Sequence, residues 1–76
     1  MSKGWHYQLM RHVDYNGDDY YAIHEYYPAA LFPEGEQDGW TQSPCDVTGY
    51  SVEDVVWSLK AMLNDIEKHG VKDYVD

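Results

Sequence analysis

The stretch from Val52 to His69 constrains the fold most, because its apolar residues recur at the period of one face of an α-helix. Seven apolar side chains form this pattern: Val52, Val55, Val56, Leu59, Met62, Leu63 and Ile66. At about 100° per residue they share an arc of about 120°. We therefore expect one long amphipathic helix, over about residues 52–69, whose apolar arc covers one face of a sheet.

Capping residues mark both ends of this helix. Ser51 is the expected N-cap, and Asp54 three positions later completes a capping box. Lys68 and His69 suit the negative end of the helix dipole. Gly70 can adopt the left-handed conformation that ends many helices. The two ends of the helix are therefore defined by the sequence itself.

Three segments before the helix have the character of β-strands. In residues 5–15 the more apolar side chains lie mainly at odd positions and the more polar ones mainly at even positions. This near-alternation predicts a strand whose odd-numbered side chains face the core. Asn16 and Gly17 then form the strongest short turn signal in the chain. The aromatic-rich residues 20–27 are expected to return as the second strand of an antiparallel hairpin. Residues 39–42 are a short third strand.

The register of this hairpin stays open at the level of sequence. A two-residue turn at Asn16 and Gly17 would place Val13 opposite Tyr20. A longer loop would place Val13 opposite Ile23. Because a slip of one residue moves every side chain to the other face, the inner face of the second strand is not assigned.

These elements predict an α+β fold in a single domain spanning residues 1–76. The architecture is a three-stranded antiparallel sheet, a hairpin plus a short third strand, covered by one C-terminal amphipathic helix. A chain of 76 residues buries only about 60% of its unfolded surface, so an enclosed substrate cleft would use much of its core. The length therefore favours a binding module over an enzyme.

The charge balance excludes some partners and favours others. Fourteen acidic residues against five basic ones give a formal net charge of -9. This charge repels phosphate backbones and anionic lipids, so we expect neither nucleic-acid nor membrane binding. It suits a basic protein partner, although acidity also serves solubility alone. The single cysteine excludes an internal disulfide, and the absence of an apolar leader or long apolar run favours a cytoplasmic protein.

No residue pattern predicts catalysis, a metal or a cofactor. His6 and His12 are about 20 Å apart along a strand, and no familiar metal-ligand spacing occurs. The four histidines are therefore expected on the surface or at the helix end. Cys45 lies beside Asp46, which would raise the pKa of the thiol, so a half-buried structural role is expected.

Trp57 is the candidate for a binding residue, because it lies opposite the apolar arc on a charged helix face. The expected partner-binding surface combines the outer helix face with two acidic loops. Its residues are Asp54, Trp57, Ala61, Asn64, Asp18 and Glu36. The alternatives are that a loop or the C-terminal tail covers Trp57, or that the helix mediates a homodimer.

An ordered set of short motifs resembles a group of short uncharacterised bacterial and phage proteins. The motifs are Trp5-x-Tyr7, Tyr21-Ala22-Ile23-His24-Glu25, Gly39-Trp40-Thr41, Pro44, Gly49-x-Ser51-x-Glu53-Asp54 and Met62-Leu63. This group carries no established activity to transfer. The order of elements is also similar to the N-terminal domain of HicB-type antitoxins, which implies a small basic toxin as partner.

The sequence therefore predicts a small, acidic, non-enzymatic protein-binding module. One version is a phage or mobile-element inhibitor of a basic nucleic-acid-handling host protein. The alternatives are a HicB-like antitoxin that neutralises a small basic toxin, a small-ligand-binding protein with a pocket at Tyr20, Tyr26 and His24, or a structural homodimer.

Overall fold

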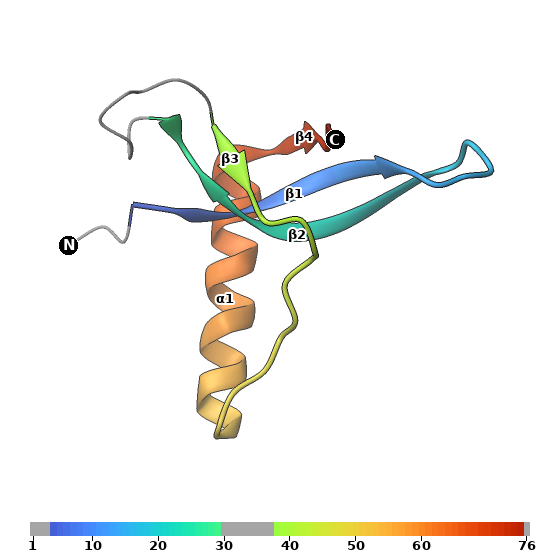
Figure 1. The fold of residues 1–76 in the computed structure, drawn as a ribbon. Helices are drawn as coiled ribbons and strands as arrows, with labels where there is room; N and C mark the ends of the chain where they lie inside the picture. The colour runs from blue at the N-terminus through green and yellow to red at the C-terminus, as the bar shows by residue number, and fades with distance from the viewer. Residues whose placement is uncertain (1–3, 30–37, 76) are drawn as a thin grey trace.

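The computed structural model of the chain describes residues 4–29 and 38–75. Its elements in chain order are β1 (His6–Val13), β2 (Asp19–Tyr27), β3 (Gly39–Trp40), α1 (Val52–His69) and β4 (Val71–Asp73). They form one helix and a curled sheet with strand order β3-β2-β1-β4 (Figure 1). The expected α+β class is confirmed, as are the hairpin and the helix that follows the first three strands. The prediction of a purely antiparallel three-stranded sheet is wrong, because β4 adds a parallel edge strand.

The additional strand β4 follows directly from the end of the helix. Gly70 adopts a positive φ of 68°, a conformation that glycine reaches without steric cost. This turn directs the chain back along β1, where Val71 lies opposite Leu9. The pairing is extended by the Tyr74 amide, which donates to the Arg11 carbonyl at 2.9 Å. Three exposed residues without alternation give no strand signal in the sequence, so this element was missed.

The β1–β2 hairpin has neither of the two registers considered from the sequence. Val13 lies opposite Asp19, rather than opposite Tyr20 or Ile23. The carboxylate of Asp14 determines the loop, because its Oδ1 accepts hydrogen bonds from the amides of Asn16 (2.9 Å) and Asp18 (3.0 Å). This side-chain bonding to nearby amides replaces the tight turn that Asn-Gly alone would make.

The register places the even-numbered residues of both long strands on the more buried face. Gln8 and Met10 of β1, and His24 of β2, have no exposed surface, and Tyr26 is 5% exposed. The prediction that odd-numbered residues of β1 face the core is therefore wrong. The reason is the segment after the helix, which covers the even face: Gln8 Nε2 donates to the carbonyl of Gly70 at 2.8 Å.

Ser51 and Gly70 cap α1 as predicted, but two details of the prediction are wrong. Gly70 combines its positive φ with a ψ of -151°, which is not the left-handed helical conformation. The Asp54 carboxylate accepts from the Tyr50 amide, whereas a capping box would use the Ser51 amide. The amide of Asp54 donates to Ser51 Oγ at 3.1 Å, and the amide of Gly70 donates to the carbonyl of Ile66 at 2.9 Å. The helix begins and ends at the predicted residues, Val52 and His69. Within the described part of the chain, no helix combines the length and the apolar character needed to cross a membrane.

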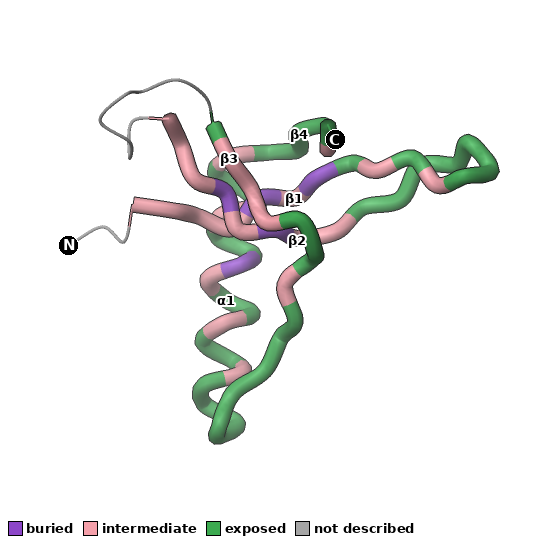
Figure 2. Tube along the Cα trace, viewed as in Figure 1, coloured by how far each residue is buried: buried purple, intermediate pink, exposed green. Residues whose placement is uncertain are grey.

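The helix meets the sheet at its C-terminal end, while its first turns extend away from it (Figure 1). Asp65 fixes this end, because its Oδ2 accepts a hydrogen bond from the Tyr7 amide at 2.9 Å. Met62 is the buried residue of the helix (Figure 2), and Val55 and Ile66 are half-buried. The helix was expected to cover one face of the sheet with its whole apolar arc, but it covers that face only in part. Most of the apolar arc is exposed.

We predict that Met10→Ala lowers the free energy of unfolding by about 2–4 kcal/mol, because it removes a fully buried side chain from a small core. Urea denaturation followed by circular dichroism measures the change. Val13→Ala on the same strand is the matched control, since Val13 is 63% exposed, and it should change the free energy by less than about 0.5 kcal/mol. Equal losses in the two variants would contradict the assignment of the buried face.

Candidate functional site

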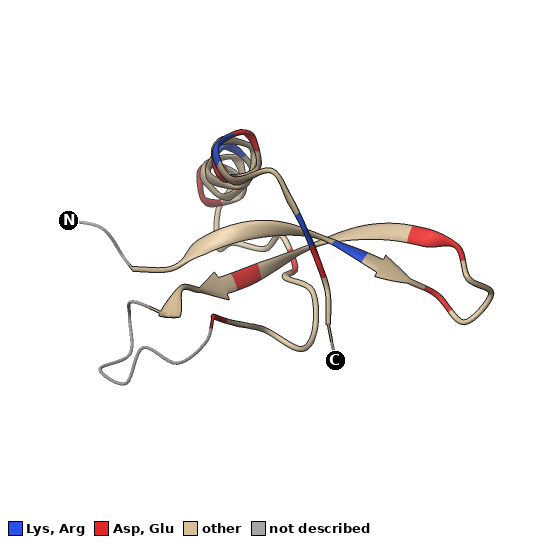
Figure 3. Ribbon diagram, turned by 90° about the horizontal axis from the view of Figure 1, so that it is seen from above, with Lys and Arg blue, Asp and Glu red and all other residues tan. Residues whose placement is uncertain are grey.

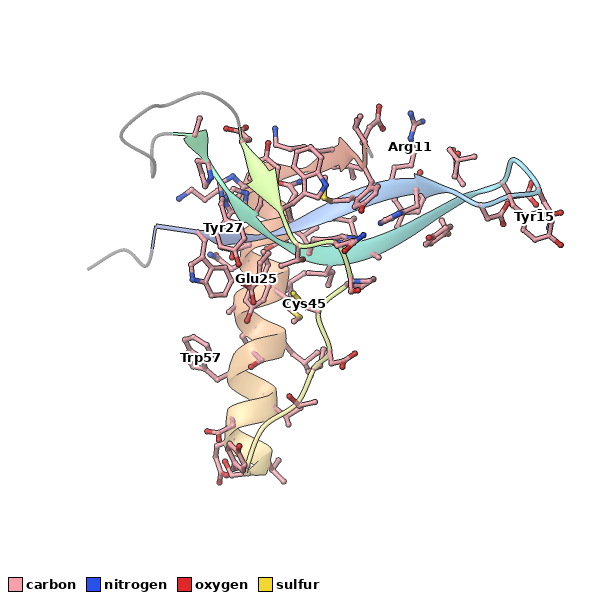
Figure 4. All side chains as sticks on the ribbon, in the orientation of Figure 1. Arg11, Tyr15, Glu25, Tyr27, Cys45 and Trp57 are labelled. Carbon is pink, nitrogen blue, oxygen red and sulfur yellow. The ribbon has the colours of Figure 1, made fainter. Side chains whose placement is uncertain are left out.

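Trp57 projects from the middle of α1 into solvent and is 65% exposed (Figure 4). Burying a tryptophan side chain against a partner releases a large apolar area from water. Trp57 also lines hollows on more than one side of the helix. Neither the described loops nor the described tail covers it, so Trp57 remains a candidate contact residue.

One hollow lies between Trp57 and the start of the helix and has a volume of about 510 Å³. Its lining residues are Thr48, Gly49, Tyr50, Asp54, Trp57 and Ser58. Asp54 Oδ2 accepts a hydrogen bond from the Tyr50 amide at 3.2 Å, which fixes the carboxylate beside a fully exposed Tyr50 ring. A Cβ at Gly49 would lie 2.6 Å from Asp54 Cβ, so a side chain at position 49 would displace this arrangement.

A second hollow, of about 500 Å³, lies on the sheet side of Trp57. Ala61 and Asn64 line it together with Trp57, and Lys68 lies at its far end. Four of the six predicted binding residues therefore border these two neighbouring hollows: Asp54, Trp57, Ala61 and Asn64. Ala61 is half-buried, while Asn64 is exposed.

The two acidic loops of the predicted surface do not extend this site. Asp18 lies in the loop between β1 and β2, at the tip of the hairpin, which points away from the helix (Figures 1 and 3). A contact to Trp57 and to Asp18 at once would have to span the sheet. Glu36 lies outside the described residues. The candidate site is therefore confined to α1 and the segment before it.

Histidines and tyrosines form a cluster on the buried face of the sheet that sequence reasoning missed. His12 Nε2 and His24 Nε2 are 2.8 Å apart. His24 Nδ1 lies 2.9 Å from the Thr41 carbonyl oxygen, which only accepts, so Nδ1 carries the proton and Nε2 accepts from His12. The rings of Tyr20 and Tyr74 each stack with the ring of His12. The prediction that the histidines lie on the surface is therefore wrong for His24.

A second histidine pair joins the start of β1 to the end of α1. The rings of His6 and His69 stack with their centroids 3.6 Å apart. His6 Nε2 also lies 3.0 Å from Gln8 Oε1. The signal for both pairs was present in the sequence, since His6 and His12 share the even positions of β1. It could be interpreted only with the register known.

Burial affects the titration of several groups. Burial lowers the pKa of His24, and the neighbouring His12 adds to the effect, against the opposing bond to Thr41. Burial also lowers the pKa of His69, with His6 adding to the effect. Burial raises the pKa of Tyr26 to about 12, and the hydrogen bond from its hydroxyl to Asp38 contributes.

Cys45 is half-buried, as expected, and its amide donates to the Ile23 carbonyl at 2.8 Å. Burial raises the pKa of the thiol, and the charges of Glu25 and Asp46 raise it further. A thiol kept protonated in this way is a poor nucleophile. Among the described residues, no group of three His, Cys, Asp or Glu side chains is arranged to hold a metal ion.

Comparison with protein-family models, with curated protein sequences and with solved structures gives no match for this chain. The resemblances to short bacterial and phage proteins and to HicB-type antitoxins therefore stay predictions. The candidate site is defined by its own geometry alone.

We predict that the free energy of unfolding falls as the pH falls below about 6.5, the ordinary pKa of histidine. The lowered pKa values of His24 and His69 mean that the unfolded chain binds protons at a higher pH than the folded chain does. The free energy of unfolding is thus greatest above about pH 6.5. It falls as the pH drops from this value through the lowered pKa values of His24 and His69 in the folded chain. Urea denaturation between about pH 5 and 7.5, above the carboxylate range, measures it.

Two variants distinguish this effect from general acid sensitivity. His24→Asn should reduce the slope of stability against pH, because it removes one of the two shifted histidines. Tyr15→Asn, at the hairpin tip and 98% exposed, should leave the slope nearly unchanged. A flat profile for the wild type, or equal slopes in all three proteins, would contradict the proposed origin.

Proposed function

We propose that this chain is a non-enzymatic protein-binding module that recognises a basic protein through the outer face of α1. The observation that carries the proposal is Trp57, which is 65% exposed and lies beside Tyr50 and the carboxylate of Asp54. An exposed tryptophan of this kind is the residue type most enriched among the energetic centres of protein interfaces.

The chemistry of the first hollow favours an arginine or lysine side chain from the partner. Tyr50 and Trp57 present aromatic faces, which attract a cation. Asp54 supplies a carboxylate that can accept charge-assisted hydrogen bonds. Because Asp54 already accepts a bond from the Tyr50 amide, its position is fixed before the partner arrives, which reduces the entropic cost of binding.

The net charge of the chain supports the same class of partner. A formal charge of -9 attracts a basic protein over distances of about one Debye length and increases the rate of encounter. Acidic residues lie along the hairpin as well as on the helix (Figure 3). The hairpin therefore contributes steering, while the face around Trp57 contributes the contact.

The two side chains that could act in catalysis, Cys45 and His24, have structural roles, which supports a non-enzymatic function. The Cys45 thiol has a raised pKa. His24 is buried and hydrogen-bonded on both ring nitrogens, to His12 and to the Thr41 carbonyl. A catalytic cysteine requires an exposed thiol with a lowered pKa, and Cys45 has the opposite. A catalytic base requires a ring nitrogen that is free to take a proton, and both ring nitrogens of His24 are occupied.

Two versions of the proposal differ in the identity of the partner. A basic nucleic-acid-handling host protein would make the chain an inhibitor from a phage or mobile element. A small basic toxin encoded beside the chain would make it a HicB-like antitoxin. The first version predicts capture of an abundant host protein, and the second predicts that co-expression relieves the toxicity of a neighbouring gene product.

A small-ligand-binding protein is a second candidate, because a hollow of about 450 Å³ lies beside the histidine cluster. His12, Tyr20 and Tyr74 line it, whereas the expected pocket residues His24 and Tyr26 are buried. The hollow offers stacking surfaces and one imidazole. Shifts of the His12 ring resonances on addition of a ligand would favour this candidate over the protein-binding module.

The test of the proposal is capture of a partner by tagged protein, followed by measurement of its affinity. We predict that Trp57→Ala weakens binding at least tenfold, as expected for the centre of an interface. Tyr15→Ala is the matched control, because Tyr15 is a fully exposed aromatic residue at the hairpin tip (Figure 4). Affinity should also fall steeply as salt is raised.

Circular dichroism must show that Trp57→Ala keeps the helix. Equal affinities of wild type, Trp57→Ala and Tyr15→Ala would move the contact away from α1. An acidic partner whose affinity does not depend on salt would contradict the charge argument.

A further inference from the structure

A second surface of α1 adjoins the face around Trp57. It consists of four exposed apolar residues, which we call the apolar flank: Val52, Val56, Leu59 and Leu63. They are 77%, 41%, 51% and 58% exposed, respectively. At about 100° per residue all four fall within an arc of about 60°, whereas Trp57 lies about 130° from its centre. An apolar strip of this length on one helix indicates an interaction surface.

The spacing of the apolar flank is that of a coiled-coil seam. Steps of four, three and four residues separate its members, which is the alternation of a and d positions in a heptad repeat. In this frame Val56 and Leu63 occupy a positions, and Val52 and Leu59 occupy d positions. A seam of this kind pairs with another helix of matching period.

The chain exposes more surface than a compact monomer of its mass. Its accessible surface is 5822 Å², whereas about 4800 Å² is expected for a folded monomer of 8.9 kDa. The radius of gyration is 13.6 Å, against about 11 Å expected for 76 residues. The four residues of the apolar flank contribute to this excess, together with the exposed hairpin tip, where Tyr15 is 98% exposed.

We propose that the apolar flank pairs with the apolar flank of a second copy of this chain, with the two helices antiparallel. The register that uses all four residues places Val52 opposite the partner's Leu63 and Val56 opposite the partner's Leu59. By the two-fold symmetry each contact occurs twice. A hollow of about 320 Å³ borders the flank on the side nearest Trp57, and its lining residues are Val52, Glu53, Val56, Trp57 and Lys60.

The charges beside the flank select this register. Glu53 and Lys60 occupy e positions, and e positions face each other in an antiparallel pair. In the register above, Glu53 lies beside the partner's Lys60, and this pair also occurs twice. A shift by one heptad would instead bring Lys60 against the partner's Lys60 and Glu53 against the partner's Glu67, which is repulsive.

The fold favours the antiparallel arrangement over a parallel one. The first turns of α1 extend away from the sheet (Figure 1), so antiparallel helices place the two sheets at opposite ends. In a parallel pair, e positions would face g positions, which here are Val55 and Met62 and carry no charge. Met62 is also buried within its own chain. The charge pattern is therefore satisfied only between antiparallel helices.

The test is the mass in solution by light scattering and the dissociation constant by sedimentation equilibrium. Wild type should have the mass of two chains at high concentration and dissociate on dilution. Leu59→Asp should be monomeric at every concentration, with unchanged circular dichroism, because Leu59 is half exposed in the monomer. A wild type that is monomeric throughout would overturn the proposal.

A charge exchange tests the register without disturbing the apolar residues. Lys60→Glu should weaken the dimer about tenfold, because it creates two repulsive pairs with Glu53. The double variant Lys60→Glu/Glu53→Lys should recover the wild-type constant, since it restores opposite charges. Lys68→Glu is the matched control, with the same change of net charge on the other side of the helix, and should have little effect.

No recovery in the double variant would overturn the register. Dimerisation that is lost in Trp57→Ala and kept in Leu59→Asp would overturn the assignment to the apolar flank. Because the proposed partner contact uses Trp57, failure of the dimer leaves that proposal standing, and failure of partner binding leaves the dimer standing.

Discussion

Gln8 is the residue on which the arrangement of this fold depends. Its side chain has no exposed surface, and its Nε2 group donates to the carbonyls of Gly70 and Leu9 at 2.8 and 3.1 Å. A buried amide left without partners would cost about 1–3 kcal/mol, so the end of the helix is held at the centre of β1. The position of Gly70 in turn determines where β4 pairs and which face of the hairpin is covered.

Anchoring at one end has a consequence for the rest of the helix. Asp65 and the stacked pair of His6 and His69 hold the last turns of α1 against β1, while the first turns have no sheet beside them (Figure 1). The apolar arc is thus divided between two uses. Met62 is buried in the chain's own core, and the apolar flank is available to another helix. The two proposed surfaces, around Trp57 and along the apolar flank, are neighbouring faces of the helix and border a common hollow.

The sequence was most informative where local rules decide the outcome. The caps at Ser51 and Gly70 predicted the bounds of the helix. The position of Trp57 opposite the apolar arc left open whether a loop or the tail covers it, and its 65% exposure came from the structure. The predictions were wrong where the structure depends on pairing between residues far apart in the sequence. The side chain of Asp14 set the hairpin register, and no local pattern ranks that bond against a tight turn at Asn16 and Gly17. The contact of His12 with His24 could not be found before that register was known, and β4 has no strand signal of its own.

Amide hydrogen exchange along α1, measured at low and high protein concentration, tests most directly whether the helix is anchored at one end and completed by a second copy. The account predicts that amides of residues 62–69 are protected at both concentrations, since their end of the helix is fixed within the chain. Amides of residues 56–60 should exchange quickly in dilute solution and become protected as the concentration rises. Equal protection of both halves at all concentrations would contradict it.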